Sequence, residues 1–176
     1  LFRSIDKKID IASNPLIVFI NSAVDIISKN WTYESMFKYL KTGLIKEFRG
    51  VEGAGLIDEL ENYVLAYGIK GKKWMEEWVN YSSSILKEEE VLEENKQRLE
   101  RLNDIRETIV TPLDEFNKQC KGKKTLKEFA TILYEFLDSK LDIMDTIDKY
   151  VDYFKENDMA IEAKEYSEVR SEEHTS

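Results

Sequence analysis

The chain has 176 residues, of which 42% are hydrophobic and 11% aromatic, enough to bury the core of one domain. The single cysteine, Cys120, excludes an internal disulfide, and no uninterrupted apolar run is long enough to cross a bilayer. These features indicate a reducing, cytoplasmic setting without membrane contact.

The charges are unevenly divided along the chain. The formal net charge is −9, with 11 basic and 11 acidic residues in 1–80 but 14 basic and 22 acidic residues in 81–169. Binding to DNA phosphates requires clustered lysine and arginine. A DNA-binding surface is therefore expected in the first half, and the acidic second half is expected to face water or protein.

The only histidine, His174, lies in the heptapeptide RSEEHTS at the end of the sequence. This heptapeptide looks like the translation of a sequencing adapter, so we expect residues 170–176 to be a non-native read-through scar. Residues 1–169 contain no histidine and therefore lack the usual general base and the commonest metal ligand.

Two prolines, seven glycines and apolar residues spaced three and four apart predict an all-α chain. Asn14 is expected to cap a first helix that begins at Pro15 and has an apolar surface wide enough to be central. Thr32 is expected to cap the next helix, which Gly43 ends. A glycine-rich loop is predicted at residues 50–55.

A third helix is predicted to follow this loop and to end at Gly68. A long helix is then expected from about Glu88 to Cys120, with an apolar seam formed by Leu92, Leu99, Leu102, Arg106, Ile109, Leu113, Phe116 and Cys120. Pro112 should kink or break it close to Val110. The seam fits either an intramolecular antiparallel helix pair or a dimeric coiled coil.

Thr125 and Glu128 form a capping box ahead of a predicted helix, whose apolar residues are Leu126, Phe129, Ile132, Leu133, Phe136 and Leu137. Two further helices are expected at residues 143–154 and 159–169. With no fixed repeat and no low-complexity linker, residues 14–169 are interpreted as one irregular helical bundle of about seven to eight helices.

No group of residues in the sequence has the pattern of a catalytic site. The glycine-lysine pairs Gly71-Lys72 and Gly122-Lys123 lack the upstream glycine of a phosphate-binding loop. The carboxylates near Glu90 are interpreted as a solvated helical face rather than a divalent-metal site. Cys120 fits a packed thiol better than a nucleophile or cluster ligand. The sequence therefore predicts no catalytic, cofactor-binding or metal-binding residues.

One cluster suggests binding, namely Lys70, Lys72, Lys73 and Trp74 beside two glycines. Lysines attract backbone phosphates, and a tryptophan can stack on an unpaired base. Alternatively Trp74 and Trp78, one helical turn apart, are core anchors whose rim the lysines cover. Contact with a neighbouring subunit is a third interpretation.

Three sequence phrases resemble one family. They are NPL from Asn14, WTYESMFKYLKTGL from Trp31 and ENYVLAYGIKGKKW from Glu61, with weaker similarity in IRETIVTPL from Ile105 and GKKTLKEFATILYEFL from Gly122. The family is AddB, the B chain of the bacterial ATP-dependent helicase/deoxyribonuclease, which processes broken DNA ends before recombination. The resemblance implies that residues 14–169 are a helical insertion, similar to the 2B subdomain of superfamily 1 helicases. Residues 1–13 would then be a connector from a RecA-like motor core.

The same resemblance implies the properties of the parent complex. It would be a heterodimer with an AddA-like helicase/nuclease partner, act on double- and single-stranded DNA, and use ATP, Mg²⁺ and a four-iron four-sulfur (4Fe-4S) cluster, none of them held by this segment. The segment itself is expected to be non-catalytic and to contribute DNA-channel and subunit contacts. The alternatives are a stand-alone helical adaptor for protein interaction and a coiled-coil scaffold.

Overall fold

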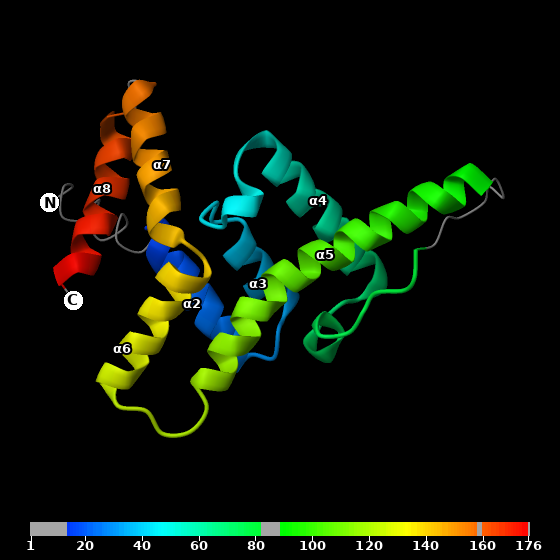
Figure 1. The fold of residues 1–176 in the computed structure, drawn as a ribbon, viewed down its shortest axis with the longest axis horizontal. Coiled ribbons are helices and arrows are strands. Elements are labelled where there is room, and N and C mark those ends of the chain that lie inside the picture. The colour runs from blue at the N-terminus through cyan, green and yellow to red at the C-terminus, as the bar shows by residue number, and fades with distance from the viewer. Residues whose placement is uncertain (1–13, 82–88, 158–159, 176) are drawn as a thin grey trace, which may run out of the picture.

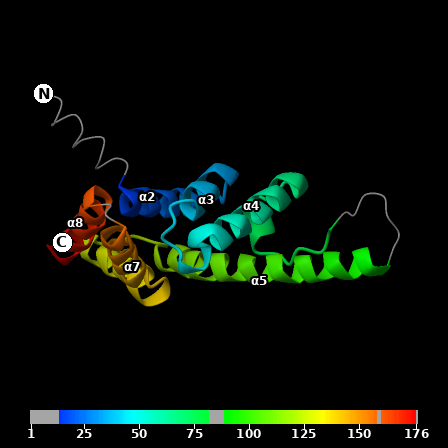
Figure 2. The same ribbon diagram turned by 90° about the horizontal axis from the view of Figure 1, so that it is seen from above.

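The computed structural model describes residues 14–81, 89–157 and 160–175. Over these ranges the chain forms seven α-helices and three short helical segments, and no strand. The predicted all-α class is therefore confirmed. A long helix, α5 (Glu89–Gln119), crosses the molecule diagonally in Figure 1 and runs along one side of it in Figure 2. The earlier helices α2, α3 and α4 lie along it, and α7 and α8 pair at one end (Figure 2).

The first two helices begin where their capping residues predict. In α2 (Pro15–Ser28) the Asn14 side chain accepts a hydrogen bond from the Leu16 amide at 2.9 Å, with Pro15 in the first turn. In α3 (Tyr33–Leu40) the Thr32 hydroxyl accepts from the Ser35 amide. Both caps use atoms within three residues, so the sequence alone was sufficient to predict them.

The predicted loop at residues 50–55 is wrong, because α4 (Gly50–Tyr67) is already helical there. Gly53 provides close packing rather than a flexible loop. A Cβ at this position would lie 2.1 Å from the carbonyl carbon of Phe48, in the short helical segment η1 (Lys46–Phe48). The predicted end of the helix is confirmed, since Gly68 adopts a left-handed conformation with φ of 58°.

Helix α5 continues through Pro112, so the expected break is wrong. The ribbon is nearly straight in Figure 2. Proline removes the hydrogen bond to the carbonyl of Thr108, but Thr108 is exposed and water can satisfy that oxygen. Buried contacts hold the helix in place on both sides of the proline, through Leu102, Ile109, Leu113 and Phe116.

The apolar seam of α5 is packed inside the chain over only part of its length. It is buried from Leu102 to Phe116, whereas Leu92 is 61% exposed. A seam that is already covered by helices of the same chain is not available to a second copy. The packing therefore favours the intramolecular interpretation over the dimeric coiled coil.

The capping box at Thr125 and Glu128 is confirmed at the start of α6 (Leu126–Glu135). Leu126, the first apolar residue after the capping box, is 86% exposed and adds nothing to the core. Helix α6 is peripheral, and the chain enters the core only in the following π-helical turn η3 (Phe136–Lys140). There Phe136 stacks on Phe116 with ring centroids 4.5 Å apart.

The last two helices, α7 (Ile143–Glu156) and α8 (Ala160–Thr175), form a pair close to the predicted ranges. An aromatic cluster of Tyr150, Phe154 and Tyr166 joins them, with the Tyr150 and Phe154 rings both 5.3 Å from that of Tyr166. The Tyr150 hydroxyl also donates to the carbonyl of Gly43 at 2.7 Å. Helix α8 extends past Val169, and the interpretation of residues 170–176 as a scar stays a prediction.

Substitution of two helical glycines tests the start of α4. Gly53→Ala should lower the free energy of unfolding by about 1–3 kcal/mol, because its methyl group must displace the Phe48 backbone. Gly55→Ala has open space around it and should raise the free energy of unfolding by about 0.5–1 kcal/mol through helix propensity. Thermal or urea unfolding checks both, and equal effects would contradict the packing role.

Candidate nucleic-acid interface

The four residues singled out in the sequence lie on one short segment between α4 and α5. We call Lys70–Lys73 the basic turn; it overlaps the 3₁₀ segment η2 (Gly71–Trp74). Gly71 has φ of 57°, and its amide donates to the carbonyl of Trp31 at 3.3 Å. A Cβ on Gly71 would lie 3.3 Å from the side-chain nitrogen Nδ2 of Asn30, so the turn packs closely against the corner between α2 and α3.

Both tryptophans after the basic turn are buried. Trp74 is 0% and Trp78 4% exposed, and their ring centroids are 5.5 Å apart. Trp78 stacks on Tyr63 at 4.8 Å, and its indole N–H donates to the carbonyl of Lys73 at 2.9 Å. Trp74 therefore presents no face to a nucleic-acid base. Its burial agrees with the core-anchor interpretation and not with the stacking interpretation.

Helix α5 holds the backbone that follows the basic turn through two polar side chains. The Asn103 amide accepts from the Trp78 N–H at 2.9 Å and donates to the Trp78 carbonyl at 2.8 Å. Arg106 is only 5% exposed and donates to the carbonyl of Trp74 at 3.1 Å. Because these bonds satisfy buried backbone groups, losing either side chain would leave unpaired polar atoms in the interior.

A third contact fixes the end of this segment. The Tyr63 hydroxyl donates to the carbonyl of Asn80 at 2.7 Å. Burial raises the pKa of Tyr63 to about 12, so the hydroxyl remains a donor at neutral pH. Sequence reasoning placed Arg106 only on the apolar seam and did not single out Asn103. The sequence feature that could have identified them is a polar side chain within or beside the apolar seam of the long helix.

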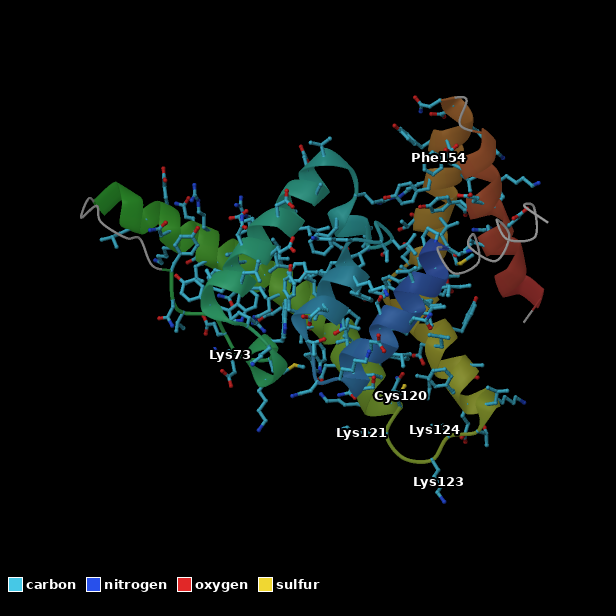
Figure 3. The ribbon with its side chains drawn as sticks, turned by 180° about the vertical axis from the view of Figure 1, so that it is seen from behind. Lys73, Cys120, Lys121, Lys123, Lys124 and Phe154 are labelled. Carbon is cyan, nitrogen blue, oxygen red and sulfur yellow. The ribbon has the colours of Figure 1, made fainter. Side chains whose placement is uncertain are left out.

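The three lysines of the basic turn differ in their contacts. The Lys73 ammonium donates to the carbonyls of Tyr67 and Gly68, both at 3.3 Å, and so caps the C-terminal end of α4. Lys70 and Lys72 are exposed, and their side chains have no hydrogen-bond or ion-pair partner among the residues that the structure describes. Two ammonium groups are thus available to a ligand, beside the Lys73 that Figure 3 labels.

The described part of the chain contains no group of side chains arranged to bind a metal ion or an iron–sulfur cluster. Within the described ranges, no three His, Cys, Asp or Glu side chains are grouped to hold a metal ion. The one cysteine, Cys120, cannot supply the thiolates of a 4Fe-4S cluster. Burial raises the pKa of its thiol despite the nearby charge of Lys124, which makes it a poor nucleophile. No helix in the described part of the chain could span a membrane.

Comparison with known proteins gives the family. The chain is 97% identical over 166 residues to the B chain of the ATP-dependent helicase/deoxyribonuclease (AddB) of Clostridium perfringens (strain 13 / Type A). The chain matches one segment of the proteins of the AddB family. More distant relatives carrying the same name are those of Clostridium tetani, 41% identical over 170 residues, and Acetivibrio thermocellus, 44% identical over 167 residues.

Each of these matches covers 94% of the chain but only 14% of the relative. The chain therefore spans about one seventh of the length of the curated relatives it matches. No protein-family model matches it. The resemblance inferred from NPL, WTYESMFKYLKTGL and ENYVLAYGIKGKKW is thus confirmed, and the chain is homologous to one part of AddB.

Substitution of Asn103 tests the anchoring of the basic turn. Asn103→Ala should lower the free energy of unfolding by about 1–3 kcal/mol, because the Trp78 amide and carbonyl lose their partners. Hydrogen exchange should also accelerate at the Trp78 amide. The exposed neighbour Asp104 provides the control, since Asp104→Ala removes none of these bonds. An unchanged exchange rate at Trp78 in Asn103→Ala would contradict the anchoring.

Proposed function

We propose that this chain is a non-catalytic helical part of AddB, within an ATP-dependent DNA helicase/exonuclease that processes double-strand breaks for recombinational repair. Its role is to hold the basic turn against the DNA backbone. The observation that carries this proposal is the pairing of a firmly anchored backbone, through Trp74, Asn103 and Arg106, with two unpartnered ammonium groups at Lys70 and Lys72 in the described part of the chain.

Anchoring the backbone favours affinity, because a segment that is mobile before binding loses conformational entropy when it binds. A turn whose backbone is fixed loses only side-chain freedom when it meets a phosphate, so more of the electrostatic attraction appears as affinity. Since Trp74 is buried, the contact is made by lysines alone. Contacts of this kind position a protein on DNA, do not read sequence, and weaken with salt.

The chemistry of the whole complex belongs to this proposal as well. The parent would use ATP and Mg²⁺, carry a 4Fe-4S cluster and pair with an AddA-like partner, all through residues outside this chain. The helical segment would correspond to a 2B-like insertion. The connector assigned to residues 1–13 lies outside the described residues.

An apolar surface of the chain supports contact with the rest of AddB. An apolar groove of about 510 Å³ lies between α2 and α6. It is lined mainly by Leu16, Ile17, Ile20, Leu133, Tyr134 and Val169. Helix α6 has no fully buried residue, and most of its residues that line the groove are exposed, so the groove is open on the α6 side within the described chain.

We assign the groove to AddB polypeptide beyond this segment. The relatives contain about six times more sequence than the chain matches, and Asn14 and Val169, from opposite ends of the described helices, both line the groove. A stand-alone adaptor fits less well with a 97% match to so much longer a protein. A coiled-coil scaffold fits less well with the buried seam of α5.

Removal of the two free charges tests the DNA contact. Lys70→Ala with Lys72→Ala in the assembled complex should weaken binding to forked DNA and reduce the slope of log affinity against log salt by about 1.4–1.8, the value for two lost phosphate contacts. Fluorescence anisotropy at several salt concentrations measures this slope. Lys38→Ala with Lys155→Ala removes two exposed charges from α3 and α7 and serves as the control. Identical slopes for the two double variants would refute the assignment.

A charge placed in the groove tests the contact with the rest of AddB. Ala130 is exposed here and lines the groove, so Ala130→Glu should destabilise full-length AddB by about 3 kcal/mol if the groove is covered there. Leu126→Glu, on the same helix but outside the groove, should leave its melting temperature nearly unchanged. Equal melting temperatures for both variants would show that the groove faces water.

A further inference from the structure

The loop that joins α5 to α6 carries the densest positive charge in the chain. Residues 118–127 read KQCKGKKTLK, with five lysines and no acidic residue, in a chain whose net charge is −9. Residues 121–128 are all exposed. The acidic average of the second half conceals this run, whose Gly122-Lys123 pair does not match a phosphate-binding loop.

The carboxylates nearest to this loop are already engaged. Asp114 pairs with Lys118 at 2.6 Å, and Glu115 pairs with Lys140 at 3.0 Å. Glu128 accepts from the Thr125 amide at 2.7 Å, a bond that lowers its pKa and fixes it at the start of α6. Asp114 and Glu115 are thus paired with other lysines, whereas Glu128 keeps its negative charge, which also interacts with Lys124; the lysines of residues 121–127 outnumber this single carboxylate by four to one.

Among the described residues, four lysines form no side-chain hydrogen bond or ion pair, namely Lys121, Lys123, Lys124 and Lys127, although the charge of Lys124 helps to lower the pKa of Glu128. Gly122, with φ of 81° and open space around it, turns the chain so that its neighbours project from the tip. Figure 3 shows Lys123 pointing away from the molecule, and shows the loop and Lys73 along the same edge in that view. The capping box then fixes the first turn of α6 behind the loop.

We infer that Lys121, Lys123, Lys124 and Lys127 form a second surface that binds the phosphodiester backbone of DNA. This inference rests on the proposed DNA-binding function but uses a separate set of residues. Several ammonium groups close together with no carboxylate between them favour a ligand with regularly spaced negative charges. Residues 118–127 include no aromatic side chain, so the loop binds phosphates without stacking on bases.

An anionic membrane surface is the main competing ligand, since Leu126 is exposed beside the lysines. DNA is favoured because a single leucine supplies little apolar area for insertion, and the loop is too short to form an amphipathic helix lying in the interface. Binding to vesicles is accordingly an outcome of the test.

The test uses the assembled complex with full-length AddB and a labelled forked DNA. Lys121→Ala, Lys123→Ala and Lys124→Ala together should weaken binding about tenfold or more at low salt and reduce the salt slope by about 2–2.7, for three lost phosphate contacts. The triple Lys→Arg variant keeps the charges and should bind like the wild type. Lys38→Ala, Lys96→Ala and Lys155→Ala remove three exposed lysines from elsewhere and should change little.

The outcomes separate this inference from the proposed function. If the loop variant keeps the wild-type salt slope while the slope falls in Lys70→Ala with Lys72→Ala, the DNA-binding role of the loop lysines is refuted and that of the basic turn is supported. If both keep it, both assignments fail. Wild-type binding to phosphatidylserine vesicles that the loop variant loses, with DNA binding intact, would assign the lysines to a membrane and overturn the inference.

Discussion

The structure depends on the contact between α5 and the segment that follows the basic turn. Two indoles, Trp74 and Trp78, are buried there, and Asn103 and Arg106 reach from α5 to satisfy their backbone groups. Apolar burial supplies most of the stabilisation, while the hydrogen bonds restrict the arrangement to one register because each buried backbone group must find its partner. The backbone groups that follow this irregular turn are thereby satisfied by side chains, as those of a helix are satisfied by its own backbone.

Under the proposed function, this anchoring explains how a chain without a recognisable catalytic motif would contribute to a DNA-processing complex. Its contribution lies in where it places charge and which surfaces it leaves apolar. Lys73 is used to cap α4, whereas Lys70 and Lys72 face solvent. The groove between α2 and α6 provides an apolar surface on which the rest of AddB can pack. Neither feature requires a reactive side chain, which agrees with the proposed mechanical role.

Local signals were predictable from the sequence, and features that depend on distant residues were not. The caps at Asn14, Thr32 and Thr125 involve neighbours within three residues, and each was predicted. The helical start of α4 was missed because clustered glycines are typical of a loop, although Gly53 packs against Phe48 only five residues earlier. The continuity of α5 at Pro112 depends on buried contacts from other helices. In the candidate site the lysines and the core-anchor interpretation of Trp74 were visible in the sequence, but the bond from Arg106 to the Trp74 carbonyl required the fold.

The measurement that tests the central claim most directly is an experimental structure of the assembled complex on forked DNA. We predict that the turn keeps its present conformation, with Trp74 buried and the Lys70 and Lys72 ammonium groups within ion-pair distance of backbone phosphates. A DNA path that leaves both lysines in solvent, or an indole of Trp74 turned outward onto a base, would contradict this prediction.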